Sequence, residues 1–245
     1  MPSLFTLDDR RGGKNLIRLL ALLLALAVTP MVALAQQWDI EEEQGGGHVL
    51  PPTVHPHGYS LERMASLLAF FTSTGNNQKF YPFPQFPDRS DPFQILDLDF
   101  TKPQPTPFKV YAGTMFYVPI FLLDDSPPII DTFPKDSRDA TDYFLNKARL
   151  GGHSWNIIVD GRQTDLGPEF FAGPVDTPPL ADAPPCQGGT HAFLFGVFLT
   201  PLSIRGSPHT IIFSGVLDGT AVRDANSGNP FTETVTYSVT VVPPR

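Results

Sequence analysis

From residue 108 onward, the chain alternates between short apolar runs and turns built from Gly, Pro and Asp. The runs occupy residues 108–123, 155–159, 192–199, 210–217 and 232–242. Short runs rich in Val, Ile, Phe and Tyr are typical of β-strands, and Ala112-Gly113 is expected to divide the first run into two strands. With weaker segments included, we expect seven to nine strands and two short helices. This inventory predicts a mainly β fold, an antiparallel β-sandwich or jelly roll, rather than a βαβ architecture.

Local patterns also predict how some strands pair. Asp160-Gly161 follows the run at 155–159 and predicts a tight hairpin, because both residues tolerate positive φ. The runs at 192–199 and 210–217 are continuously apolar and joined by a Pro-containing loop, so we expect a hairpin buried on both faces. In the run at 232–242, Thr or Ser alternates with Val and Tyr, which predicts one face exposed to water.

Two segments have helical spacing. The apolar residues between 61 and 71 recur at steps of three or four, which predicts a helix over 60–74. A second helix is expected over 137–150, where Gly151-Gly152 supplies a stop signal. Residues 80–107 are rich in Pro and aromatic side chains, and we expect them to run extended because Pro lacks the backbone donor that a helix or sheet needs.

The first 35 residues have the layout of a secretory signal peptide. Arg10, Arg11, Lys14 and Arg18 precede an apolar run over 19–28, and Ala33-Leu34-Ala35 puts small residues beside a cleavage point. The run is too short for a membrane span, which takes about 20 apolar residues. We therefore expect cleavage after Ala35, no stable membrane span in the mature chain, and a secreted or periplasmic protein.

Composition divides the remaining chain into regions. Residues 36–58 combine acidic residues, three consecutive glycines and prolines, which predicts a flexible, disordered arm. Residues 59–107 hold the first helix and the extended segment, and residues 108–245 hold the sandwich core, with 59–245 expected to form one domain. Cys186 is the only cysteine, so no intramolecular disulfide can form and stability must come from packing.

The charge balance excludes one class of partner. Residues 1–35 hold four basic and two acidic side chains, so the mature chain has 13 basic against 23 acidic side chains, a net charge of about −10. Nucleic-acid affinity depends on cationic contacts with phosphates. We therefore expect no nucleic-acid partner.

Two acidic turns are candidate calcium sites, because calcium prefers oxygen ligands. The stronger candidate is Asp124-Asp125 with Asp131. The weaker is residues 218–229, which contain Asp and Asn but depart from the EF-hand spacing. The alternative interpretation is that these residues only form turns. Apart from calcium, no cofactor is expected.

Histidines offer a second kind of metal site. His153, His191 and His209 each introduce an apolar run, and three imidazoles would suit zinc or copper. If the runs at 192–199 and 210–217 form a hairpin, however, His191 and His209 lie at its opposite ends, roughly 27 Å apart, and do not share an ion. His48, His55 and His57 in the expected arm are a weaker group.

Two hydrolase patterns compete with a binding role. Gly152-His153-Ser154 begins like a lipase nucleophile turn, but Asn156 stands where that turn needs glycine and a strand is expected to follow, so Ser154 is not expected to be catalytic. A polysaccharide hydrolase needs two carboxylates across a cleft, and Asp125, Asp165 and Glu169 are candidates. Aromatic residues such as Trp38 and Trp155 are candidates for sugar stacking, although aromatics at strand spacing mostly form the core.

The carboxy-terminal half resembles a loose set of uncharacterised exported bacterial proteins with an immunoglobulin-like β-sandwich. The resemblance covers residues 108–242 and is carried by Gly189-Thr190-His191, by residues 199–203 (Leu-Thr-Pro-Leu-Ser), by His209-Thr210-Ile211 and by the final strand at 236–241. In this chain Arg205-Gly206-Ser207-Pro208 lengthens the turn. The resemblance implies export and a sandwich, and no activity.

We favour an exported, non-enzymatic β-sandwich that acts as a binding or cell-envelope-associated module for an unknown surface or carbohydrate ligand. It fits the signal peptide and the strand inventory, and no coherent catalytic set accompanies them. A secreted hydrolase acting on polysaccharide is the first alternative. A metal-binding extracellular protein is the second.

Overall fold

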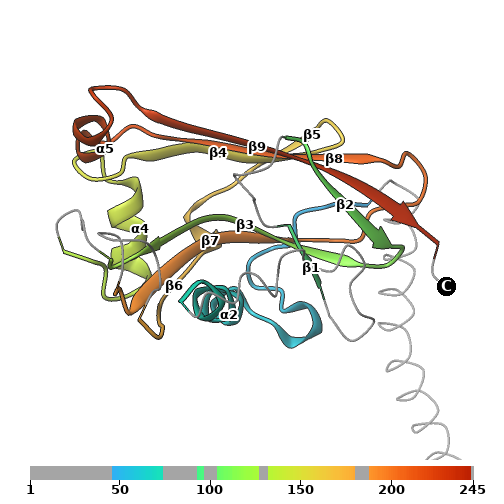
Figure 1. The fold of residues 1–245 in the computed structure, drawn as a ribbon, viewed down its shortest axis with the longest axis horizontal. Coiled ribbons are helices and arrows are strands. Elements are labelled where there is room, and N and C mark those ends of the chain that lie inside the picture. Colours follow the sequence, from blue (N-terminus) through green and yellow to red (C-terminus); the bar gives the residue numbers. More distant parts are fainter. Residues whose placement is uncertain (1–45, 74–92, 97–103, 127–131, 180–187, 244–245) are drawn as a thin grey trace, which may run out of the picture. The chain divides into compact units, whose positions relative to one another are not determined.

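A computed structural model describes residues 46–73, 93–96, 104–126, 132–179 and 188–243, with the backbone alone for 70–73 (Figure 1). Residues 45–245 form one compact unit. The predicted signal peptide, the acidic part of the predicted arm and most of the Pro- and aromatic-rich segment lie outside the described residues.

The described residues form nine strands in two sheets, and the predicted mainly β fold is confirmed. One sheet has the order β1-β3-β7-β6 and the other has the order β2-β9-β8-β4-β5. Most neighbours are antiparallel, but β1 is parallel to β3 and β2 is parallel to β9. The strands are β1 (Phe93–Ile95), β2 (Thr106–Tyr111), β3 (Met115–Asp124), β4 (Gly152–Val159), β5 (Arg162–Asp165), β6 (Phe171–Asp176), β7 (His191–Leu199), β8 (His209–Leu217) and β9 (Phe231–Val242).

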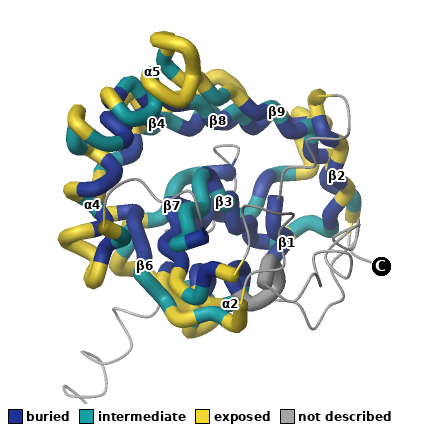
Figure 2. The backbone as a smooth tube through the Cα atoms, turned by 60° about the vertical axis from the view of Figure 1, so that its left-hand side comes forward, coloured by how far each residue is buried: buried dark blue, intermediate teal, exposed yellow. Residues whose placement is uncertain are grey.

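The two sheets lie face to face, with buried residues concentrated between them (Figure 2). On β8 the buried residues alternate with partly exposed ones, so the strand has one wet face and the predicted burial of 210–217 on both faces is wrong. β9 shows the predicted alternation over Val235–Val241, where the Thr and Ser residues point away from the core. The predicted Asp160-Gly161 hairpin joins β4 to β5, and both turn residues have positive φ.

One predicted pairing is wrong. β7 and β8 do not form a hairpin: β7 pairs with β3 and β6 in one sheet, whereas β8 pairs with β4 and β9 in the other. Two apolar strands joined by a short loop look alike whether they pair side by side or cross between sheets. The burial patterns of the two strands distinguish these arrangements, because β7 is buried on both faces and β8 on one.

The described helices cover and close the sandwich. Helix α2 (Leu61–Ser73) confirms the first predicted helix and packs against β6 and β7, which explains why β7 is buried on both faces (Figure 1). Helix α4 (Ser137–Leu145) confirms the second in a shorter form, with Asp136 as its N-cap. Helix α5 (Thr220–Ala225) was not predicted. Two 3₁₀ turns occupy Pro56–Gly58 and Pro168–Phe170, and among the described helices none is long and apolar enough to cross a membrane.

Residues 46–50, which the sequence assigns to a disordered arm, bond to the core. The Gly47 N–H donates to the Pro201 carbonyl at 3.1 Å, and the Leu50 N–H donates to the Phe198 carbonyl at 2.9 Å. Gly46 is needed here because it has positive φ and because a Cβ atom would lie 2.0 Å from the Pro201 oxygen. Composition alone predicted disorder; the backbone contacts offset the ordering entropy.

Trp155 links the two sheets. It is 5% exposed, and its indole ring lies 5.7 Å from the Phe195 ring on β7 and 6.2 Å from the Phe121 ring on β3. The indole also covers Gly215 on β8, where a Cβ atom would lie 2.1 Å from the ring. Only glycine at position 215 leaves room for the Trp155 ring.

We expect Gly215→Ala to lower the free energy of unfolding by about 1–3 kcal/mol, because the added methyl overlaps the indole ring. Urea unfolding measures the loss, and Ser214→Ala, the neighbouring position on the opposite face, serves as the control. Trp155→Phe in the Gly215→Ala background frees space, so the double variant should lose less than the sum of the single losses. Strictly additive losses would contradict this packing.

Candidate functional site

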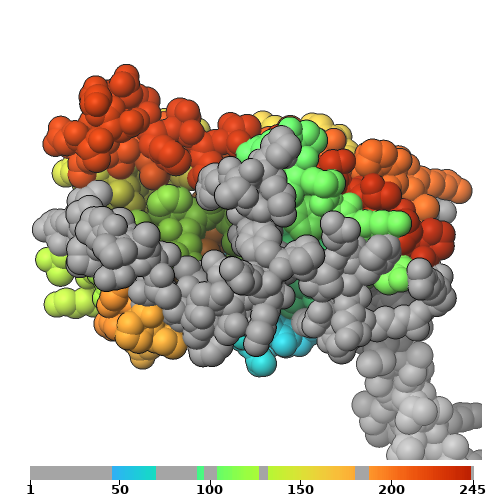
Figure 3. All heavy atoms as spheres, in the orientation of Figure 1, coloured from blue at the N-terminus to red at the C-terminus, as the bar shows by residue number. Residues whose placement is uncertain are grey.

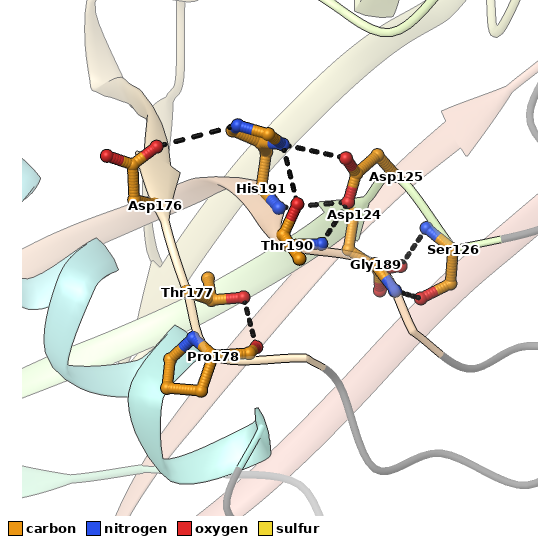
Figure 4. Close-up of polar contacts among 9 residues, drawn as sticks. All are labelled: Asp124, Asp125, Ser126, Asp176, Thr177, Pro178, Gly189, Thr190 and His191. Atoms are coloured by element: carbon orange, nitrogen blue, oxygen red, sulfur yellow. Dashed lines mark hydrogen bonds and ion pairs between the residues drawn. The ribbon is translucent and has the colours of Figure 1, made fainter.

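A histidine between two carboxylates lies at one end of the four-stranded sheet (Figure 4). His191 begins β7, Asp125 follows the end of β3, and Asp176 ends β6. Because β7 pairs with both β3 and β6, the ends of these strands converge here. The sequence singled out Asp125 and His191 separately, and the structure brings them together.

Asp125 binds the start of β7 through both carboxylate oxygens. Its Oδ1 accepts the Thr190 N–H at 2.6 Å and the His191 N–H at 2.9 Å, and its Oδ2 lies 2.7 Å from Nδ1 of His191. Burial by itself would raise the pKa of Asp125. The hydrogen bonds from His191 and Thr190 outweigh this effect and hold the pKa of Asp125 below its ordinary value.

The other side of the imidazole faces Asp176. Nε2 of His191 lies 3.5 Å from Oδ1 of Asp176, whose side chain is almost fully exposed. Each ring nitrogen of His191 therefore faces one carboxylate. The imidazole fills the space between the two carboxylates, so Asp125 and Asp176 are not arranged as the open acid pair that a glycosidase uses.

The five-stranded sheet contains the same arrangement of an Asp and a His. Oδ1 of Asp160, in the turn after β4, accepts the Thr210 N–H at 2.9 Å, and its Oδ2 lies 2.6 Å from Nδ1 of His209. Nε2 of His209 lies 2.6 Å from the Ser203 carbonyl, and the His209 side chain is 3% exposed. Each ring nitrogen of His209 thus faces an oxygen atom, one from Asp160 and one from the Ser203 carbonyl. In each sheet, therefore, an Asp after one strand fixes the His that begins its neighbour.

A third histidine contacts a serine. β4 contains a bulge between His153 and Asn156, and Ser154 within it has a φ of 56°, which is rare for a residue other than Gly, Asn or Asp. Nδ1 of His153 lies 2.9 Å from Oγ of Ser154, and its Nε2 lies 4.0 Å from Oδ2 of Asp218.

This cluster has the residue types of a Ser-His-Asp triad without its geometry. The carboxylate of Asp218 accepts N–H groups from Arg223, and this bond lowers the pKa of Asp218. A separation of 4.0 Å is too long for Asp218 to orient the imidazole by a hydrogen bond. As predicted, Ser154 is followed by a strand and not by a helix, so no helix N-terminus faces the Ser154 hydroxyl.

The predicted calcium residues lie at the end of β3. Oδ1 of Asp124 accepts the Ser126 N–H at 2.7 Å within the turn, and Asp125 is engaged as described. Asp131 lies outside the described residues. Calcium at Asp124, Asp125 and Asp131 therefore stays a prediction. Across the described ranges, no group of three or more His, Cys, Asp or Glu residues is arranged to hold a metal ion.

Other predicted residues are dispersed. Asp165 lies in β5 of the five-stranded sheet, Glu169 in the 3₁₀ turn before β6, and Asp125 at the end of the four-stranded sheet. Residues 218–229 form α5 and its flanks instead of an open loop; Asn226 there donates to the Pro230 carbonyl at 3.1 Å. Trp155 belongs to the core and not to a sugar-stacking surface.

Sequence reasoning missed three polar residues of interest. Asp176 and Asp160 stand at a strand end and in a turn, where Asp is ordinary. Glu233 lies on the same face of β9 as buried Val235 and Tyr237, and burial raises its pKa to about 7. The alternation along 232–242 could have indicated the burial of Glu233, because Glu233 occupies a position that faces the core.

Comparisons with known proteins found no relative of this chain. No family model matches the chain, and neither the curated proteins nor the solved structures contain a match.

We expect Asp125→Asn to lower the free energy of unfolding by about 1–3 kcal/mol, because it removes a charged acceptor of three hydrogen bonds. Asp124→Asn, which changes an acceptor of one bond, is the matched control and should lose less. The pKa of Asp125 is lowered, so its contribution is present above about pH 4 and fades as the pH falls through its folded value. A difference between wild type and variant that grows on acidification would contradict this assignment.

The calcium prediction has a direct test. Calcium bound at the turn after β3 should raise the melting temperature, a chelator should reverse the rise, and Asp124→Asn should remove it. Differential scanning calorimetry of the wild type and this variant measures the effect. An unchanged wild-type melting temperature rejects the site.

Proposed function

We propose that the protein is an exported, non-enzymatic β-sandwich of immunoglobulin-like strand order, which acts as a binding or cell-envelope-associated module. The strand order is the observation that carries the proposal. In their order across the sheets, β3, β7 and β6 correspond to strands B, E and D of an immunoglobulin domain, and β9, β8, β4 and β5 correspond to strands G, F, C and C′.

The position of Trp155 supports the same proposal. Immunoglobulin domains carry a buried Trp on strand C, packed against a disulfide between strands B and F. Trp155 lies on β4, the counterpart of strand C, and contacts Phe121 of β3 and Gly215 of β8, the counterparts of B and F. With a single cysteine in the chain, aromatic packing would replace the disulfide.

The outer face of the five-stranded sheet is the proposed contact surface. Thr232, Thr234 and Thr240 on β9 are exposed, and Thr236 and Ser238 are half-buried on the same face. Helix α2, by contrast, packs on the four-stranded sheet. Short hydroxyl side chains and few charges suit a neutral hydroxylated surface such as a glycan better than a charged polymer.

The alternatives have weaker support. For a polysaccharide hydrolase, the described acids are dispersed or, as at Asp125 and Asp176, separated by an imidazole. For a metal-binding protein, the candidate is the turn with Asp124 and Asp125, whose oxygens already accept hydrogen bonds.

We expect residues 36–245 to bind a subset of ligands on glycan and cell-surface arrays and to turn over no polysaccharide or ester substrate. Thr234→Lys with Thr236→Lys should weaken that binding at least tenfold, because the two lysines add bulk and charge to the contact face. Ser66→Lys on the exposed side of α2 is the control and should keep the wild-type affinity. Substrate turnover by the wild-type protein, or binding that the control loses equally, would overturn the proposal.

A further inference from the structure

Glu233 is an acidic residue on the core side of β9. It pairs directly with Gly215 on β8 and shares its face with buried Val235 and Tyr237. Directly paired residues in an antiparallel sheet have Cβ atoms about 5 Å apart. Because the Trp155 indole occupies the space over Gly215, Trp155 and Glu233 are both neighbours of the same glycine on β8.

Neither polar group has a partner among the described residues. Nε1 of Trp155 is buried and makes no hydrogen bond there, and neither a hydrogen bond nor a neighbouring charge contributes to the pKa of the Glu233 carboxyl. Burial is the sole cause of the raised pKa of Glu233. A neutral carboxyl tolerates this position, whereas a carboxylate is poorly solvated there.

None of the described charged groups at this end of the sandwich compensates the charge of Glu233. They belong to the strands and helices around it, and none contributes to its pKa, which responds to burial alone. The groups are His153 on β4, Asp218 after β8, Arg223 on α5, Lys147 after α4 and Asp124 at the end of β3. Asp218 and Arg223 neutralise each other in an ion pair.

This half of β9 is the less firmly held half. β2 pairs with β9 only from Tyr237 to Val242, so among the described residues the strand around Glu233 is paired through β8 alone. Phe231, the first residue of β9, is 43% exposed. Helix α5, which leads into this segment, stands out at the upper left of the space-filling view in Figure 3.

We propose that residues 231–235 of β9 act as a pH-gated flap: with Glu233 neutral the segment stays paired to β8, and ionisation of Glu233 favours a local opening that exposes Trp155. The opening stays local because β2 holds the second half of β9. An edge segment held on one side needs fewer broken contacts to reach water than the core does.

The pH range follows from the two states of Glu233. In the closed state burial raises its pKa to about 7, whereas in the opened segment its pKa returns to the ordinary value of 4.5. The opened state therefore releases more protons between these values, and opening becomes more favourable as the pH rises from 4.5 to 7. Above this range both states are ionised, and the equilibrium levels off.

Hydrogen exchange of the full mature chain tests the flap. After correction for intrinsic exchange rates, protection of residues 231–235 should fall by up to about tenfold per pH unit across the transition and then become constant. Residues 237–242 should keep their protection. In a Trp38→Phe background, Trp155 emission should shift to longer wavelength over the same range.

Glu233→Gln keeps the neutral shape of the side chain and should abolish the pH dependence while the segment stays closed. Asp224→Asn, which changes an exposed acid on α5, and His153→Gln, which replaces the imidazole two positions before Trp155 on β4, should leave it unchanged. The flap is refuted by pH-independent protection in the wild type, by an unaltered pH dependence in Glu233→Gln, or by protection lost equally in all strands.

Discussion

The packing of the Trp155 indole between the sheets is the contact on which the rest of the structure depends. The ring covers Gly215 on one sheet and approaches Phe195 and Phe121 on the other. Phe144 of α4 joins it at 5.5 Å, so the helix that closes this end of the sandwich rests on the same ring. A chain with one cysteine has no internal disulfide to hold its sheets together, and dense aromatic packing serves instead.

Much of the fold was predictable because local patterns report which face of a strand is buried. The alternation in β9, the Asp160-Gly161 turn and the apolar stripe of α2 each depend on residues close in sequence. The partner of β7 was not predictable in this way. Its continuous apolar run resulted from burial under α2 on one side and against the opposite sheet on the other, and the same run was taken as evidence for a hairpin.

The arrangement of the candidate sites likewise depends on strand pairing, which the sequence does not show. Asp125 and His191 were each noticed from the sequence, but as parts of separate metal sites 66 positions apart in the chain. Only the pairing of β3 with β7 brings them together. The bond between Asp160 and His209 depends likewise on β4 and β8 being neighbours. A turn-forming Asp therefore has a second role that becomes visible only when the strand order is known.

The acids of this protein differ in how the fold compensates their charge. Asp125 receives two backbone N–H groups and an imidazole, which outweigh its burial. On the carboxyl of Glu233 burial acts alone, so its neutral form is favoured instead. Both lie near a strand end that one neighbour holds: among the described residues, β3 beyond Tyr117 pairs with β7 alone, and β9 before Tyr237 pairs with β8 alone. Asp125, whose charge is compensated, thus fixes the start of β7, whereas Glu233, whose charge is not compensated, stands in the segment proposed to open.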